Sequence, residues 1–111
     1  MDGATLAVFS NSGSGNQGLT CTLPVYEYGR LTNKTKEEII RALTLSHLMS
    51  IYIKNKIGRL SALCGIVNAS MGAASGIILL KGGNIYQMCY AIRNMINTIT
   101  GMACDGAKPS C

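Results

Sequence analysis

Residues 60–80, LSALCGIVNASMGAASGIILL, carry no charged side chain. A run of this length is long enough to cross a bilayer as a helix. However, Asn68, three serines and three glycines lower its hydrophobicity. Small residues four positions apart, such as Gly72 and Gly76, let a helix approach its neighbours closely. The stretch therefore predicts a buried, closely packed central helix, and a membrane-spanning helix is the alternative.

A second helix is predicted upstream of this stretch. Thr35 and Glu38 have the spacing of a capping box, in which each residue satisfies a backbone amide at the start of a helix. The apolar residues that follow, up to Gly58, point all round the helix axis, which is typical of a helix buried on every side. His47, the sole histidine of the sequence, lies in this helix and is expected to be a hydrogen-bonded core side chain.

A third helix is predicted downstream. Asn84 and Gln87 have capping-box spacing, and apolar residues recur at helical intervals as far as Ile99. Cys89 falls on this apolar stripe and is expected to be a core thiol. No helical period is found in residues 1–30, where Pro24 argues against a long helix.

The Ser/Gly segment, residues 11–18, lies in this first part of the chain. Its glycines permit positive φ angles, and successive N–H groups in such a backbone form a concave site for an anion. A flexible surface loop is the alternative. The candidate residues for binding a carboxylate or phosphate are Asn11, Ser12, Gly13, Ser14, Gly15, Asn16, Gln17 and Gly18. The predicted fold is thus all-α: an N-terminal Gly/Ser-rich loop, three packed buried helices and a C-terminal cysteine loop.

Five cysteines are present, and the N-terminus has no secretory signal, so a cytoplasmic location without a disulfide framework is expected. Cys64, Cys104 and Cys111 would suit a soft metal or an iron–sulfur cluster if the fold brought them together. Their spacing matches neither a ferredoxin run nor a paired zinc motif, so simple burial is the alternative. Cys21 is expected to be a buried packing residue.

The charge pattern argues against several classes of partner. The net charge is +5, but the basic residues are scattered and no nucleic-acid-binding module is visible. Charged residues make up 14% of the chain, against roughly 25% in an average soluble domain. So little charge predicts a tight oligomer or a piece of something larger, with neither nucleic acid nor membrane as a partner.

Three segments resemble the iron–sulfur L-serine dehydratase alpha-chain family, in particular its L-cysteine desulfidase-like branch. They are the Ser/Gly segment (NSGSGNQG), residues 53–65 (IKNKIGRLSALCG) and residues 101–111 (GMACDGAKPSC). The resemblance implies a [4Fe–4S] cluster held by Cys64, Cys104 and Cys111, with one iron left open. It also implies that the Ser/Gly segment holds the carboxylate of an amino-acid substrate.

The reaction implied by this resemblance is α,β-elimination from L-cysteine or L-serine. The open iron would act on the β-thiol or β-hydroxyl, and the products would be pyruvate, ammonia and hydrogen sulfide or water. Family members are several times longer, and an N-terminal region supplies the base in the desulfidase branch. Residues 1–111 are therefore expected to be a fragment of the catalytic domain, packed against that region or against a second copy. An inactive helical remnant that serves only as a structural piece is the alternative.

Overall fold

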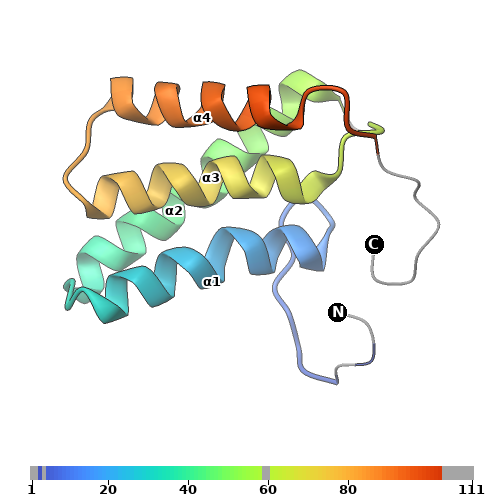
Figure 1. The fold of residues 1–111 in the computed structure, drawn as a ribbon. Helices are drawn as coiled ribbons and strands as arrows, with labels where there is room; N and C mark the ends of the chain where they lie inside the picture. The colour runs from blue at the N-terminus through green and yellow to red at the C-terminus, as the bar shows by residue number, and fades with distance from the viewer. Residues whose placement is uncertain (1–2, 4, 59–60, 104–111) are drawn as a thin grey trace.

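The computed structural model describes residues 3, 5–58 and 61–103. This part of the chain is all-α, as predicted, and its extended backbone is limited to a single isolated bridge between Asn11 and Ser14. It contains four helices where the sequence predicted three. They are α1 (Gly15–Leu31), α2 (Lys36–Ile57), α3 (Gly65–Leu80) and α4 (Ile85–Ile99) (Figure 1).

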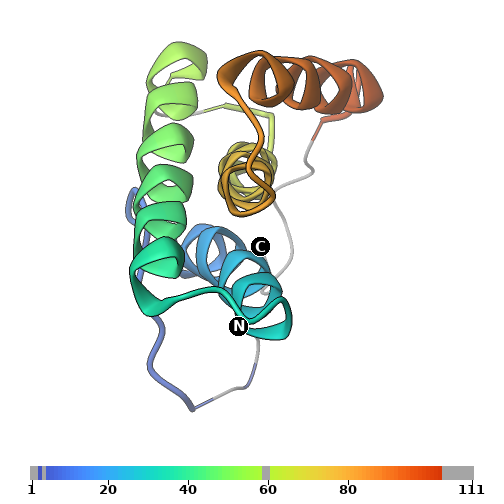
Figure 2. The ribbon, with the colours of Figure 1, turned by 90° about the vertical axis from the view of Figure 1, so that its left-hand side faces the viewer.

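Helix α3 is the centre of the bundle. It packs against α1, α2 and α4, and Figure 2 shows it end-on with the other three helices around it. Helices α1 and α3 run in the same direction, whereas α2 and α4 return the chain (Figure 1). The N-terminal ends of α1 and α3 therefore lie at the same end of the molecule as the C-terminal ends of α2 and α4.

Small residues allow α3 to approach its neighbours as closely as the sequence predicted. A Cβ atom on Gly72 would overlap the backbone carbonyl oxygen of Ser46, and one on Gly76 would lie 2.8 Å from that of Ala42. Val25 of α1 also lies against Gly76 and is fully buried. The described helices include none that is both long enough and apolar enough to cross a membrane.

Helix α1 contradicts the prediction that the first thirty residues lack a long helix. Pro24 lies inside it, where proline removes one backbone hydrogen bond, but its ring is exposed and the chain continues as a helix. The opposite face buries Cys21, Val25 and Gly29, which recur every four residues. Packing of this face against α2 and α3 outweighs the cost of the proline, as tertiary contacts often outweigh helix propensity.

The predicted capping boxes of α2 and α4 are both confirmed. Thr35 Oγ1 accepts from the amide of Glu38, whose carboxylate accepts from the amide of Thr35 at 2.8 Å. Asn84 and Gln87 make the equivalent pair at the start of α4. Helix α3 begins at Gly65, five residues later than Leu60, the start that the uncharged run predicted.

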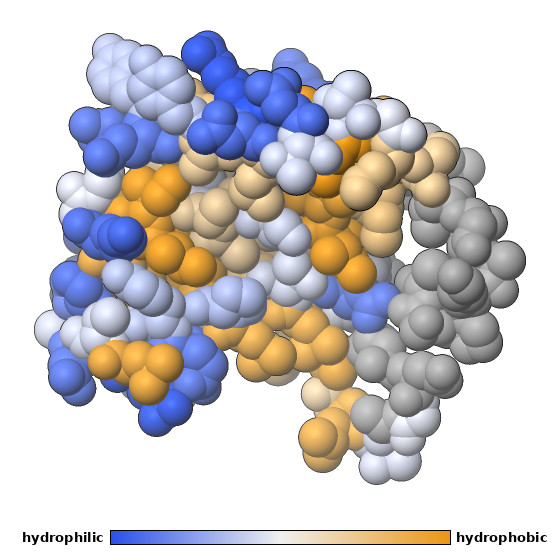
Figure 3. Space-filling model, in the orientation of Figure 1, coloured by the Kyte–Doolittle hydropathy of each residue, from blue (hydrophilic) through white to orange (hydrophobic). Residues whose placement is uncertain are grey.

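The predicted burial of the outer helices is wrong for this part of the chain. Helix α2 buries only Ala42, Ser46 and Ser50, and α4 buries only Met88. Cys89 is exposed rather than a core thiol. Periodicity identifies the apolar side of a helix, but it does not tell whether another element covers that side. Figure 3 shows the result, with apolar residues open to solvent across one face of the molecule.

Candidate functional site

The Ser/Gly segment begins with a tight turn. The backbone groups of Asn11 and Ser14 exchange two hydrogen bonds of 3.0 Å across it. The two central residues, Ser12 and Gly13, have φ angles of 52° and 81°. Turns with positive φ at both central positions favour glycine and small polar residues, which is the composition found here. The predicted loop is therefore confined to residues 11–14.

The rest of the Ser/Gly segment forms the first turn of α1. Ser14 is the N-cap, and its hydroxyl accepts from the amide of Gln17 at 3.3 Å. Gly18 lies so close to the backbone at Phe9 that a Cβ on Gly18 would overlap the carbonyl oxygen of Phe9. The first amides of any helix lack partners within the helix, and the helix dipole adds partial positive charge to this end. This geometry suits an anion.

Gln17 connects this turn with Cys64. Gln17 is 3% exposed, and its side chain packs directly on Gly65. A Cβ on Gly65 would overlap the side-chain nitrogen, Nε2, of Gln17. The side-chain oxygen of Gln17 is buried and has no hydrogen-bond partner within the described residues. Cys64, the residue next to Gly65, is the N-cap of α3, and its thiol is half-buried and free. The fold thus places the N-terminal ends of α1 and α3 side by side.

The other two proposed cluster ligands, Cys104 and Cys111, lie outside the described residues. Within the described ranges, no group of three or more His, Cys, Asp or Glu side chains could hold a metal ion. The described chain before these cysteines ends at Ala103, which follows α4 at the end of the molecule where α3 begins (Figure 1). Cys64 is the N-cap of α3. The described residues therefore include one of the three predicted ligands and do not test the set.

His47 is hydrogen-bonded, as predicted, but it is half-buried rather than part of the core. Its Nδ1 lies 3.0 Å from Nδ2 of Asn11, and its Nε2 lies 3.1 Å from Oγ1 of Thr22. Burial lowers the pKa of His47, which favours the neutral imidazole. No sequence pattern connects Thr22 and His47 with the Ser/Gly segment, because the three are brought together only by the packing of α1 on α2.

Cys21 is fully buried on α1, as predicted. Its thiol lies 3.8 Å from the carbonyl oxygen of Ala69. Burial raises the pKa of this thiol, and the neighbouring hydroxyls of Ser50 and Ser46 partly offset the effect. A buried thiol with a raised pKa stays protonated and unreactive at neutral pH, so Cys21 is a packing residue.

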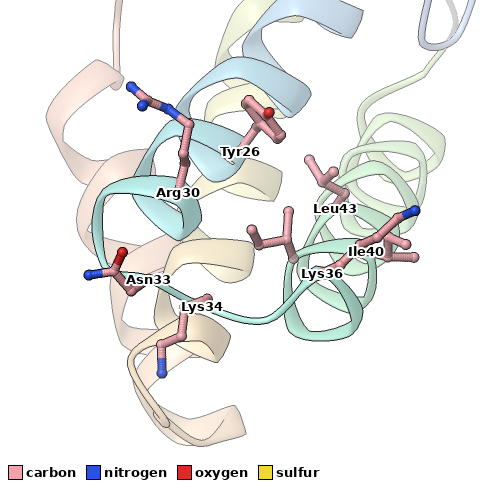
Figure 4. A pocket seen from close by; sticks show the side chains of 8 residues that line it. Tyr26, Arg30, Asn33, Lys34, Lys36, Ile40 and Leu43 are labelled. Carbon is pink, nitrogen blue, oxygen red and sulfur yellow. The ribbon is translucent and has the colours of Figure 1, made fainter.

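Two recesses lie at opposite ends of the molecule. One, of about 310 Å³, is lined by Ser12, Lys54, Asn55 and Gly58, and so joins the turn to the C-terminal end of α2. The larger, of about 600 Å³, lies where α1 meets α2 at the opposite end (Figure 4). Its Arg30 is already paired with Glu27 at 2.8 Å, as an exposed ion pair. The smaller recess is the one that adjoins the Ser/Gly segment.

Comparison with known proteins gives the family. Residues 1–111, the whole chain, match the serine dehydratase alpha chain family. The chain belongs to this family. No solved structure is significantly similar to it.

Several relatives of this serine dehydratase alpha chain domain are named UPF0597 proteins. Those of Phocaeicola vulgatus and Bacteroides thetaiotaomicron are each 60% identical over 111 residues, which is 100% of this chain and 26% of theirs. The protein of Lachnoclostridium phytofermentans is 51% identical, again over 100% of this chain and 27% of its own length. The chain therefore spans about a quarter of the length of these curated relatives.

Proposed function

We propose that this chain is part of an iron–sulfur L-amino-acid lyase that carries out α,β-elimination on L-cysteine or L-serine. The contact of Gln17 with Gly65 is the observation that supports this most directly. It brings the segment proposed to hold the substrate next to Cys64, the first proposed cluster ligand. A substrate and the metal centre that acts on it must meet in this way.

The position of Cys64 suits a ligand of a [4Fe–4S] cluster. Iron is bound by the thiolate form of cysteine, and a thiolate at a helix N-terminus is stabilised by the helix dipole. Cys64 occupies that position on α3. Cys104 and Cys111 would complete the set of three thiolates. When bound, the cluster would supply a Lewis-acidic iron for the departing thiol or hydroxyl of the substrate.

The first turn of α1 would bind the α-carboxylate of the substrate. The amides of Asn11, Ser14 and Gln17 are already bonded within the segment, so the carboxylate would be received by the central residues of the turn, Ser12 and Gly13, and by the start of α1. A helix N-terminus is a ready-made backbone site for an anion. Lys54 lines the adjoining recess with Ser12 and would add a positive charge. Together these groups would hold the amino acid by its carboxylate and leave its β-substituent free to face Cys64.

Cluster binding is tested by anaerobic reconstitution of the full chain with iron and sulfide. We expect bound iron and sulfide, thiolate-to-iron absorption and an EPR signal on reduction. Changing Cys64→Ser, Cys104→Ser or Cys111→Ser should each reduce the bound iron. Cys89→Ser is the matched control, because Cys89 is exposed on α4, outside the proposed ligand set. Iron retention that is equal in all four variants would refute the assignment.

The reaction itself is tested by incubating the reconstituted chain with L-cysteine or L-serine and measuring pyruvate. Sulfide release from L-cysteine distinguishes the two substrates. If the cluster forms and no pyruvate appears, the alternative of an inactive structural unit is favoured.

Exposed apolar side chains support the related proposal that this unit packs against further protein. Helix α4 exposes aliphatic and aromatic side chains, and the chain covers only 26% of its relatives. Exposed patches of this kind commonly mark an interface. The remaining length of a larger enzyme, or a second copy of the chain, would cover them. The residues on α4 are Ile85, Tyr86, Tyr90 and Ile96.

A further inference from the structure

Asn11 ties the turn of the Ser/Gly segment to α2. Its side chain is 4% exposed, and Nδ2 donates both to Nδ1 of His47 at 3.0 Å and to the carbonyl oxygen of His47 at 3.3 Å. Its Oδ1 accepts from the hydroxyl of Ser12 at 2.9 Å. Of the two ends of the Asn11 amide, only the NH₂ group can donate to the carbonyl oxygen of His47, so these contacts fix which way the amide points. The side chain of Asn11 is therefore engaged inside the protein.

The protonation of His47 follows from the same contacts. Thr22 donates its one hydroxyl hydrogen to the carbonyl oxygen of Gly18 at 2.7 Å. Its oxygen can then only accept from His47, so Nε2 carries the ring hydrogen. Nδ1 is left as the acceptor that Asn11 requires. Threonine on α1, histidine on α2 and asparagine in the turn thus form one directed chain of hydrogen bonds.

We infer that His47 is a positioning residue, which through Asn11 holds the Ser12–Ser14 backbone in the conformation that receives the substrate carboxylate. The part of this inference that concerns substrate rests on the proposed function. The turn needs such support, because Ser12 adopts a φ of 52°, which residues other than glycine adopt infrequently. His47 supports the turn through its hydrogen bond with Asn11, and the neutral Nε2–H form leaves Nδ1 free to accept that bond.

The first test is the tautomer of His47 in the unaltered chain. Because the sequence has a single histidine, ¹⁵N-histidine labelling gives one pair of ring-nitrogen signals. We expect a protonated Nε2 and an unprotonated Nδ1 at neutral pH. Thr22→Val removes one of the two contacts that fix the tautomer and should weaken this preference, whereas Thr20→Val should leave it unchanged, since the hydroxyl of Thr20 donates along its own helix to the carbonyl of Asn16. A protonated Nδ1, an averaged signal or an imidazolium in the unaltered chain would overturn the inference.

The second test is hydrogen exchange at the amides of Asn11 and Ser14, which close the turn. His47→Asn places an acceptor near the former Nδ1, whereas His47→Gln places its amide near the former Nε2. We expect exchange to be about tenfold faster in the Gln variant, the change that loss of one hydrogen bond of about 1.4 kcal/mol produces, and near the unaltered rate in the Asn variant. Equal rates in both variants would contradict the positioning role.

These two tests do not depend on the cluster or on turnover. If the reconstituted chain forms no pyruvate but both tests succeed, the proposed function fails and the hydrogen-bonded support of the turn stands. If the chain is active, His47→Gln should raise KM for the amino acid more than it lowers kcat, because the turn is proposed to bind the carboxylate. A fall in kcat with KM unchanged would overturn the link between His47 and substrate. Where a variant does not fold, the tautomer of the unaltered chain still decides.

Discussion

Replacing Gly72 with alanine should destabilise the bundle although it introduces a better helix former. Alanine in a helix is favoured over glycine by about 1 kcal/mol. Against this, the new Cβ would overlap the carbonyl oxygen of Ser46 and lie 3.2 Å from the Cβ of Ser50. The carbonyl belongs to the backbone of α2, so the overlap can be relieved only by moving one helix away from the other. Overpacking of this kind costs about 1–3 kcal/mol, and here the upper end applies.

We therefore expect a net loss of about 2 kcal/mol and a fall in Tm of about 8 °C. Urea unfolding followed by circular dichroism gives the free energy, and an unchanged m value shows that the unfolded state is comparable. Ser70→Ala is the control on the same helix, because Ser70 bonds only to Ile66 of its own helix, and it should be neutral or slightly stabilising. If Gly72→Ala is as stable as the original, the close approach of α2 and α3 is wrong.

Three further predictions follow from the caps, the histidine and the thiols. Thr35→Ala removes the cap of α2 and should cost about 1 kcal/mol in the same urea experiment. The pKa of His47 is lowered in the folded chain from 6.5, so the unfolded chain binds more protons as the pH falls below that value. The contribution of His47 to the free energy of unfolding should therefore be fully present above pH 6.5 and should be lost as the pH falls. His47→Asn should remove this pH dependence. Native thiol labelling should modify exposed Cys89 quickly and buried Cys21 only after unfolding, which mass spectrometry can follow.

The sequence predicted the elements that are determined by local chemistry. The capping pairs at Thr35 and Asn84 mark the true starts of α2 and α4, because a cap acts within a single turn. Gly72 and Gly76 correctly predicted a central helix, because small side chains matter wherever backbones meet.

The elements that depend on distant contacts were missed. Helix α1 buries Cys21, Val25 and Gly29, a set of small or moderately apolar residues that gives little periodic signal, and Pro24 argued against it. Only packing on α2 and α3 makes this segment helical. Conversely, Cys89 lies on an apolar stripe that α3 covers only in part, so that Met88 is buried and Cys89 is exposed.

The candidate site divides in the same way. The Ser/Gly segment was recognised from its composition, and its turn has the positive φ angles that its residues allow. The attachment of this segment to His47 and Thr22 was not recognised, because these side chains belong to different helices and meet only after folding. Cys104 and Cys111 remain predictions.

The shared direction of α1 and α3 has an electrostatic consequence (Figure 1). Neighbouring helices that run oppositely neutralise each other's dipoles, whereas two that run together place like partial charges side by side. Here α2 runs opposite to both helices and packs against both, so it offsets part of this repulsion. Neither helix has an acidic residue in its first turn to relieve this. Any negative charge that settles between these two ends is therefore attracted by both helices at once, and its hold should weaken as the ionic strength rises.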